Sequence, residues 1–112
     1  MAASFDFKGD YAITIGDDFL HEFVWEDENC DPLTLTGTFH SQIKKAGLLL
    51  ATFTCVLTGV SSNIVRLTLA SAVTGALLPV TDASWDLEHH DPGIRTVVRG
   101  KVDIVKGITE VP

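Results

Sequence analysis

The most constraining feature of the sequence is an alternation of apolar and polar residues on both sides of one turn. Trp85 and Leu87 alternate with acids before the turn, and a similar alternation runs through Val98 after it. A period of two residues is that of a β-strand, whose successive side chains point to opposite faces. The stretch 84–105 therefore predicts a β-hairpin that turns around the Asp-Pro-Gly sequence at 91–93.

The loop of this hairpin determines which residues of its two strands face each other. A two-residue loop at Pro92 and Gly93 places Leu87 opposite Val98, whereas a four-residue loop over 90–93 places it opposite Thr96. Pro followed by Gly suits a type II turn, whose twist fits a two-residue hairpin poorly, so the longer loop is predicted. In either register acids of the first strand face bases of the second, and each pair contributes about 0.2–1 kcal/mol.

The same alternation recurs along the rest of the chain, interrupted by short turns. One stretch, 71–78, has helical spacing, with Ser71 as its cap and Pro79 at its end. Seven strands at spacings of roughly ten residues predict an all-β fold, an antiparallel β-sandwich with immunoglobulin-like topology and one short helical turn. The strands predicted besides the hairpin are 11–15, 19–26, 38–44, 48–58 and 64–69. The predicted core comprises Trp25, Phe39, Phe53, Leu67, Trp85 and Leu87.

A length of 112 residues allows one domain with one core. We expect an N-terminal arm over 1–10, a single β-sandwich domain over 11–106 and a C-terminal tail over 107–112. Phe5 and Phe7 of the arm either cover the core of their own domain or dock on a neighbour, and the first alternative is favoured.

Composition and charge argue against several classes of protein. A formal net charge of −7, with eight basic residues spread along the chain, argues against nucleic acid as a partner. No apolar run approaches the length that spans a bilayer, so no membrane is expected, and the first ten residues carry no secretion signal. Cys30 and Cys55 do not make a disulfide framework, and two free thiols are expected.

Residues capable of catalysis or metal binding do not form a recognisable motif. The neighbouring His89 and His90 point to opposite faces of a strand, so they do not join His21 or His40 in one metal site. The acidic segment 26–31 is interpreted as a solvated turn, with weak cation binding as the alternative. No catalytic residue, metal or cofactor is predicted, and the chain is expected not to be an enzyme.

Several landmarks, taken in order, resemble a group of small all-β virion proteins found beside tail and baseplate genes of tailed bacteriophages. The resemblance covers residues 11–111, although Cys30 stands where the group tends to have glycine and Trp85 where it tends to have tyrosine. The landmarks are Gly16-Asp17-Asp18-Phe19, Phe23-Val24-Trp25-Glu26-Asp27, Asp31-Pro32-Leu33-Thr34-Leu35-Thr36-Gly37, Gln42-Ile43-Lys44, Leu67-Thr68-Leu69 with the helical turn after it, Trp85-Asp86-Leu87-Glu88, and Val98-Arg99-Gly100-Lys101-Val102.

The resemblance implies an immunoglobulin-like sandwich that serves as a structural or adaptor piece of a virion, in the tail, the baseplate or the attachment of fibres. Its partners would be other virion proteins, in many copies and in symmetric arrays, and it would lie in the host cytoplasm before assembly. A head decoration or neck protein is one alternative. A carbohydrate-binding β-sandwich module is another, because such modules display aromatic rings for stacking on sugars.

A sandwich that works by assembly offers its sheet edges and chain ends to partners. The strand predicted at 19–26 carries apolar residues on both sides, which indicates either a central strand or one covered by another chain. The residues predicted to make contacts are Phe5, Phe7, Leu20, Val24, Ile108 and Val111.

Overall fold

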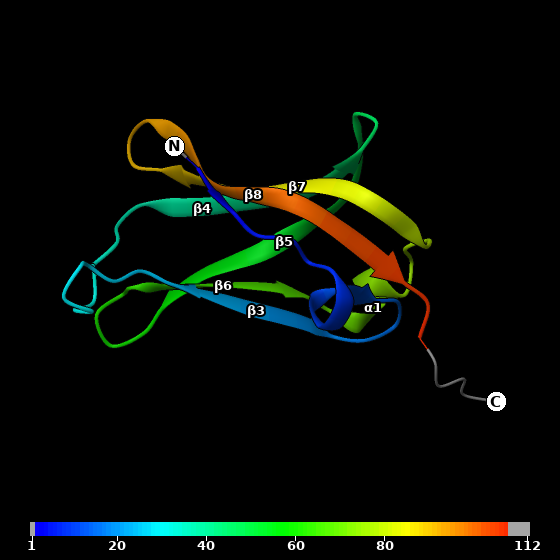
Figure 1. Ribbon diagram of the computed structural model, residues 1–112, viewed down its shortest axis with the longest axis horizontal. Coiled ribbons are helices and arrows are strands. Elements are labelled where there is room, and N and C mark those ends of the chain that lie inside the picture. The colour runs from blue at the N-terminus through cyan, green and yellow to red at the C-terminus, as the bar shows by residue number, and fades with distance from the viewer. Residues whose placement is uncertain (1, 108–112) are drawn as a thin grey trace.

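The β-hairpin predicted from the alternation over residues 84–105 is present. It lies in one half of the sheet, with further strands on both sides of it. The computed structural model describes residues 2–107. In it β7 (Val80–His90) and β8 (Ile94–Val105) are antiparallel neighbours along nearly their whole length (Figure 1).

The register of this hairpin matches the predicted two-residue loop from Ala83 to Leu87, but it matches neither predicted loop next to the turn. Leu87 lies opposite Val98, as a two-residue loop requires, yet nearer the turn Glu88 lies opposite Thr96 around a three-residue loop. The register shifts between Leu87 and Glu88, which leaves Val97 as the extra residue of a β-bulge. The predicted four-residue loop was therefore wrong. A loop of odd length alone would put the apolar positions of the two strands on opposite faces, and the extra residue of the bulge returns them to the same face.

The remaining strands extend the sheet on both sides of the hairpin. The other described elements are β1 (Ala3–Ser4), the 3-10 helix η1 (Gly9–Tyr11), β2 (Ile13–Thr14), β3 (Phe19–Val24), β4 (Thr38–Lys45), β5 (Leu48–Thr58), β6 (Ile64–Leu69) and α1 (Ser71–Thr74). Neighbouring strands follow the order β1-β8-β7-β4-β5-β6-β3, and β2 also pairs with β8.

The strands form a single curled sheet, and the sheet bends along strand β5 (Figure 1). The first part of β5, up to Phe53, pairs with β4, whereas its second part, from Thr54, pairs with β6. The all-β prediction is confirmed, and the predicted helical turn is present as α1, although the 3-10 helix η1 is a second one that was not predicted. The sheet is nevertheless mixed rather than wholly antiparallel, because β1 and β2 run parallel to β8, and its eight strands are continuous instead of forming two clearly separate sheets.

The core lies inside the curl and contains five of the six residues predicted for it. Trp25 is the exception: it is half-buried at the rim, where its ring lies 6.1 Å from that of Phe39. The buried apolar side chains are Phe7, Ile13, Phe39, Ile43, Ala51, Phe53, Val65, Leu67, Leu69, Ala83, Trp85, Leu87, Val98, Val102 and Ile104.

The helical turn α1 is tied to the loop between β2 and β3. The backbone N–H of Ser71 donates to the Asp18 carboxylate at 2.7 Å, so the cap is supplied from a distant segment rather than by Ser71 as predicted. The hydroxyl of the buried Thr74 donates to the Asp17 carbonyl at 2.7 Å and accepts from the Gly16 N–H at 3.1 Å.

None of the described helices is long and apolar enough to cross a membrane.

The predicted arm over 1–10 lies along β8 as part of the sheet. The N–H groups of Phe5 and Phe7 donate to carbonyls of β8 at 3.0 and 2.8 Å. The arm passes so close to Gly100 that a Cβ there would lie 1.9 Å from the Phe5 carbonyl oxygen, which only glycine permits. The arm therefore covers the edge of β8 at this point.

Candidate interaction surfaces

Two of the six predicted contact residues belong to the arm and are turned toward their own domain. Phe7 is fully buried inside the curl of the sheet, with its ring 4.6 Å from that of Trp85. Phe5 is half-buried, and its carbonyl accepts a hydrogen bond of 2.8 Å from the indole N–H of Trp85. Phe7 thus offers no surface to a partner in this structure, in agreement with the favoured alternative of an arm folded over its own core.

Aromatic rings close the gap between the arm and β3, where no backbone pairing is formed among the described residues. Phe5 lies 5.5 Å from Phe23 and 4.8 Å from His21, and Tyr11 lies 5.7 Å from His21, as distances between ring centroids. Partial burial in this cluster lowers the pKa of His21, although the nearby Glu22 opposes the shift. The arm and β3 are therefore connected by side-chain contacts, while the backbone of β3 pairs with β6.

Leu20 and Val24 lie on β3, which is the last strand at its end of the sheet. They point outward and are 59% and 56% exposed. Between them Glu22 accepts a hydrogen bond of 2.9 Å from the Arg66 side chain of β6. Of the two interpretations left open by the sequence, the central strand is excluded, because β3 has only β6 as a neighbour in the described sheet.

The two remaining predicted contact residues, Ile108 and Val111, lie outside the described residues 2–107.

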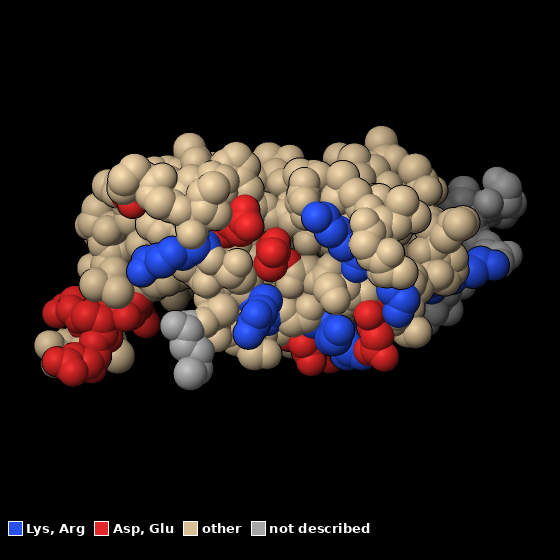
Figure 2. Space-filling view, turned by 90° about the horizontal axis from the view of Figure 1, so that it is seen from above, with Lys and Arg blue, Asp and Glu red and all other residues tan. Residues whose placement is uncertain are grey.

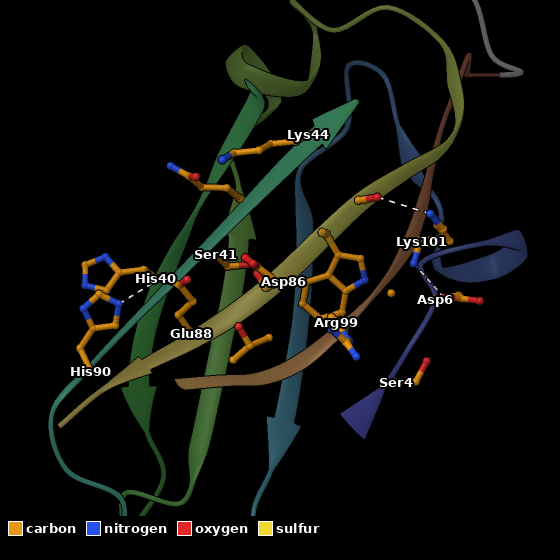
Figure 3. Close-up of a pocket in the computed structure, with 15 residues that line it drawn as sticks. Ser4, Asp6, His40, Ser41, Lys44, Asp86, Glu88, His90, Arg99 and Lys101 are labelled. Carbon is orange, nitrogen blue, oxygen red and sulfur yellow. Dashed lines mark hydrogen bonds and ion pairs between the residues drawn. The ribbon is translucent and has the colours of Figure 1, made fainter. Parts of the chain in front are cut away.

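A hollow on the outer face of β4, β7 and β8 was not singled out from the sequence (Figure 3). It is open to solvent, holds about 730 Å³ and is lined mostly by polar and charged side chains, together with Trp85. The register places Glu88 between His40 and Thr96, and Asp86 beside Arg99. Its signal in the sequence was the outward half of the alternation, which only the order of the strands assembles into one surface.

Charges of both signs meet in this hollow. Burial raises the pKa of Asp86, and the neighbouring Glu88 adds to the shift while Lys44 opposes it. At the rim the Asp6 carboxylate accepts from the backbone N–H of Lys101 at 2.8 Å. Lys and Arg are interspersed with Asp and Glu over the face seen in Figure 2. The mixed lining gives no single charge for a ligand to match.

The histidines behave as the alternation predicted. His89 stacks on Phe39, with ring centroids 4.5 Å apart, while His90 lies on the other face with its ring 4.2 Å from that of His40. The Oε1 atom of Glu88 and the Nε2 atom of His90 lie 3.2 Å apart. Within residues 2–107 no group of three potential metal-ligating side chains comes together.

The acidic segment 26–31 forms a turn at one end of the molecule, where Figure 2 shows Asp and Glu gathered. The Asp27 carboxylate accepts from the backbone N–H groups of Asn29 and Asp31 at 2.8 and 3.0 Å. Asp27 therefore stabilises the turn itself. Cys30 within it is exposed and Cys55 is half-buried; both are free thiols as expected, and burial raises the pKa of Cys55 to about 11.

The hairpin between β4 and β5 exposes one leucine that strict alternation along 48–58 places inside. Leu49 shares its parity with Ala51 and Phe53, which predicts an inward side chain, but it is exposed. The register shifts beyond Ile43, so that Ala51 faces Ile43 whereas Leu49 faces Lys44, and Leu50 becomes the extra residue. A bulge again changes which side chains face inward.

Comparison with known proteins finds no family model and no curated protein that matches this chain.

Proposed function

We propose that this chain is a non-enzymatic structural protein of a bacteriophage virion, which joins components of the tail, the baseplate or the fibres through protein–protein contacts. The ordered sequence landmarks between Gly16 and Val102, which resemble those of the virion proteins, support the phage proposal. The single structural observation that favours assembly is the regular edge strand β3, with two exposed apolar side chains on it.

We further propose that the curled sheet is an immunoglobulin-like arrangement. In that fold one layer has a strand order in which B, E and D are neighbours, and the other has C, F and G. The neighbours β3-β6-β5 and β4-β7-β8 follow these two orders, and the arm strands beside β8 correspond to strand A. In this interpretation β5 belongs to both layers because it changes partners at Thr54.

The edge strand β3 supports a protein partner more directly than a small ligand. Monomeric proteins protect exposed strand edges with charges, prolines or bulges, because a free edge pairs readily with another chain. β3 has an unbroken register with β6 over six residues, and its one outward charge, Glu22, is already paired with Arg66. An edge of this kind suits strand addition by a partner.

The proposal includes a location and a set of partners. The protein would be made in the host cytoplasm and incorporated into particles in several symmetric copies, in contact with other virion proteins and without binding nucleic acid, membrane or cofactor. The tail is favoured over the head by the resemblance.

Purification of particles from an infected culture tests this proposal. We expect mass spectrometry to recover the chain in a fixed ratio to the major tail protein through successive gradient purifications, and immunogold labelling to place it on the tail. Labelling of the head would favour a decoration or neck protein instead. Loss of the chain from purified particles would contradict a virion role altogether.

A further inference from the structure

We propose that the free edge of β3 pairs with β3 of a second copy of this chain, antiparallel and about a two-fold axis that passes beside Glu22. The inference rests on the proposed role in assembly and adds the partner, the surface and the register. It is carried by the contrast between the two ends of the sheet and by the residue pattern of β3 itself.

The two edges of the sheet differ in whether their outward backbone groups are paired. The edge of β8 is covered by the chain's own N-terminal segment, through β1, Phe7 and β2. At the other end, β3 pairs with β6 alone among the described residues. Within residues 2–107, the β3 edge is therefore the one that leaves the outward backbone groups of a whole strand unpaired and open to another chain.

The residues that present these groups follow from the register with β6. Trp25 donates its N–H to the carbonyl of Asn63 at 2.8 Å, which makes the pair at 25 and 63 a hydrogen-bonded one. In an antiparallel ladder such pairs recur at every second residue. The odd residues of β3 thus bond to β6, and the N–H and C=O groups of Leu20, Glu22 and Val24 point toward the free edge.

The side chains at these three positions match a reversed copy of themselves. With the two-fold axis at Glu22, Leu20 of one copy lies opposite Val24 of the other, and this happens twice. Apolar residues directly opposite each other stabilise a strand pair. On the inner side the same register sets His21 opposite Phe23, two rings already held in the aromatic cluster. A symmetric contact requires such self-complementarity.

Glu22 is the one residue that meets its own copy in this register. Like charges directly opposite each other destabilise a strand pair. The cost is moderated because each Glu22 is bonded to Arg66 of its own copy at 2.9 Å. Glu22 therefore weakens the pairing of the two β3 strands, and neutralising its charge should strengthen the dimer.

The small size of the contact predicts a weak dimer. Six residues of strand extend over about 20 Å, and an edge contact of that length falls below the roughly 1,200 Å² that stable interfaces bury. We expect a dissociation constant in the micromolar range or weaker, which repeated contacts in an array of copies would reinforce.

Sedimentation velocity over a concentration series tests the pairing. We expect a reversible monomer–dimer equilibrium for the full chain, weakened at least about tenfold by Leu20→Lys or Val24→Lys and strengthened by Glu22→Gln. The matched control is Val56→Lys, a side chain that is 45% exposed on β5 of the same outer face but away from the edge. Circular dichroism verifies that each variant is folded.

Disulfide capture tests the register, with Cys30→Ser as the background. A mixture of the Leu20→Cys and Val24→Cys variants should form crosslinked heterodimers under mild oxidation, whereas neither variant alone should do so to a comparable extent. A hydrogen-bonded pair separates Cα atoms by about 5.5 Å, within the range that a disulfide spans.

A chain that stays monomeric throughout, or a dimer that Leu20→Lys and Val56→Lys weaken equally, would overturn the inference. Neither result would affect recovery of the chain from particles through another surface. Conversely, a chain that dimerises through β3 but is missing from particles would retain the inference and lose the virion role.

Discussion

The burial of Phe7 yields the sharpest prediction about stability. The sequence left open whether this residue of the arm covers its own core or docks on a neighbour, and in the structure its side chain is fully buried beside Trp85. Replacement by alanine removes that ring from the interior and leaves a cavity. Buried Phe→Ala changes cost about 3–5 kcal/mol, a large share of the 5–15 kcal/mol by which a domain is typically stable.

Equilibrium unfolding in urea measures this cost. We expect Phe7→Ala to lower the free energy of unfolding by about 3–5 kcal/mol, and Leu78→Ala, at a side chain that is 81% exposed, to change it by no more than about 0.5 kcal/mol. Because both variants truncate an apolar side chain, the comparison isolates burial. A loss below about 1 kcal/mol in Phe7→Ala would show that the arm is not part of the core.

Three further predictions concern the contacts that hold the domain together. Gly100→Ala should destabilise the protein by several kcal/mol or detach the arm, because the new Cβ would meet a backbone carbonyl of the arm at 1.9 Å; thermal melting and limited proteolysis at the N-terminus would reveal either outcome. Thr74→Val should cost about 1–3 kcal/mol in chemical unfolding, since it removes a buried hydroxyl that donates to one backbone group and accepts from another; a neutral effect would mean that these bonds are not formed. The lowered pKa of His21 means that the unfolded chain binds this proton more readily, so stability should fall as the pH drops below about 6.5, the unperturbed value. His21→Gln should flatten that part of a stability–pH profile, and an unchanged profile would exclude His21 as its cause.

Period-two patterning predicted much of the fold because it reports which side chains are buried. Phe39, Phe53 and Leu67 were expected in the core and are buried there. The pattern does not record where a ladder slips by one residue. The bulges at Val97 and Leu50 each shift a register, and they changed the facing of Leu49 and the length of the hairpin loop.

The role of a strand within the sheet depends on long-range order that no local pattern specifies. The stretch at 19–26 carries apolar residues on both sides, which fits a buried central strand as well as an edge that binds a partner. Only the strand order separates the two, and it places β3 at an end. For the same reason the sequence did not predict that the N-terminal arm forms part of the sheet. The parallel pairing of the arm with β8 joins residues almost a hundred positions apart, such as Ala3 and Val98.

The hollow over β4, β7 and β8 illustrates a similar limit. His40 and His90 are far apart in the sequence, and their ring contact follows from the pairing of β4 with β7. Each strand alone shows only a polar outer face, which is typical of solvated sheets. The assembled surface could not be predicted without the order of the strands.

Hydrogen exchange at the backbone of β3 tests the central claim most directly. In the dilute monomer we expect the amides of Leu20, Glu22 and Val24 to exchange rapidly, while those of His21 and Phe23, bonded to β6, are protected. On raising the concentration to where dimers form, the first three should become protected and the last two should change little. Protection of Leu20, Glu22 and Val24 already in the monomer, or no change in their exchange on association, would contradict the account.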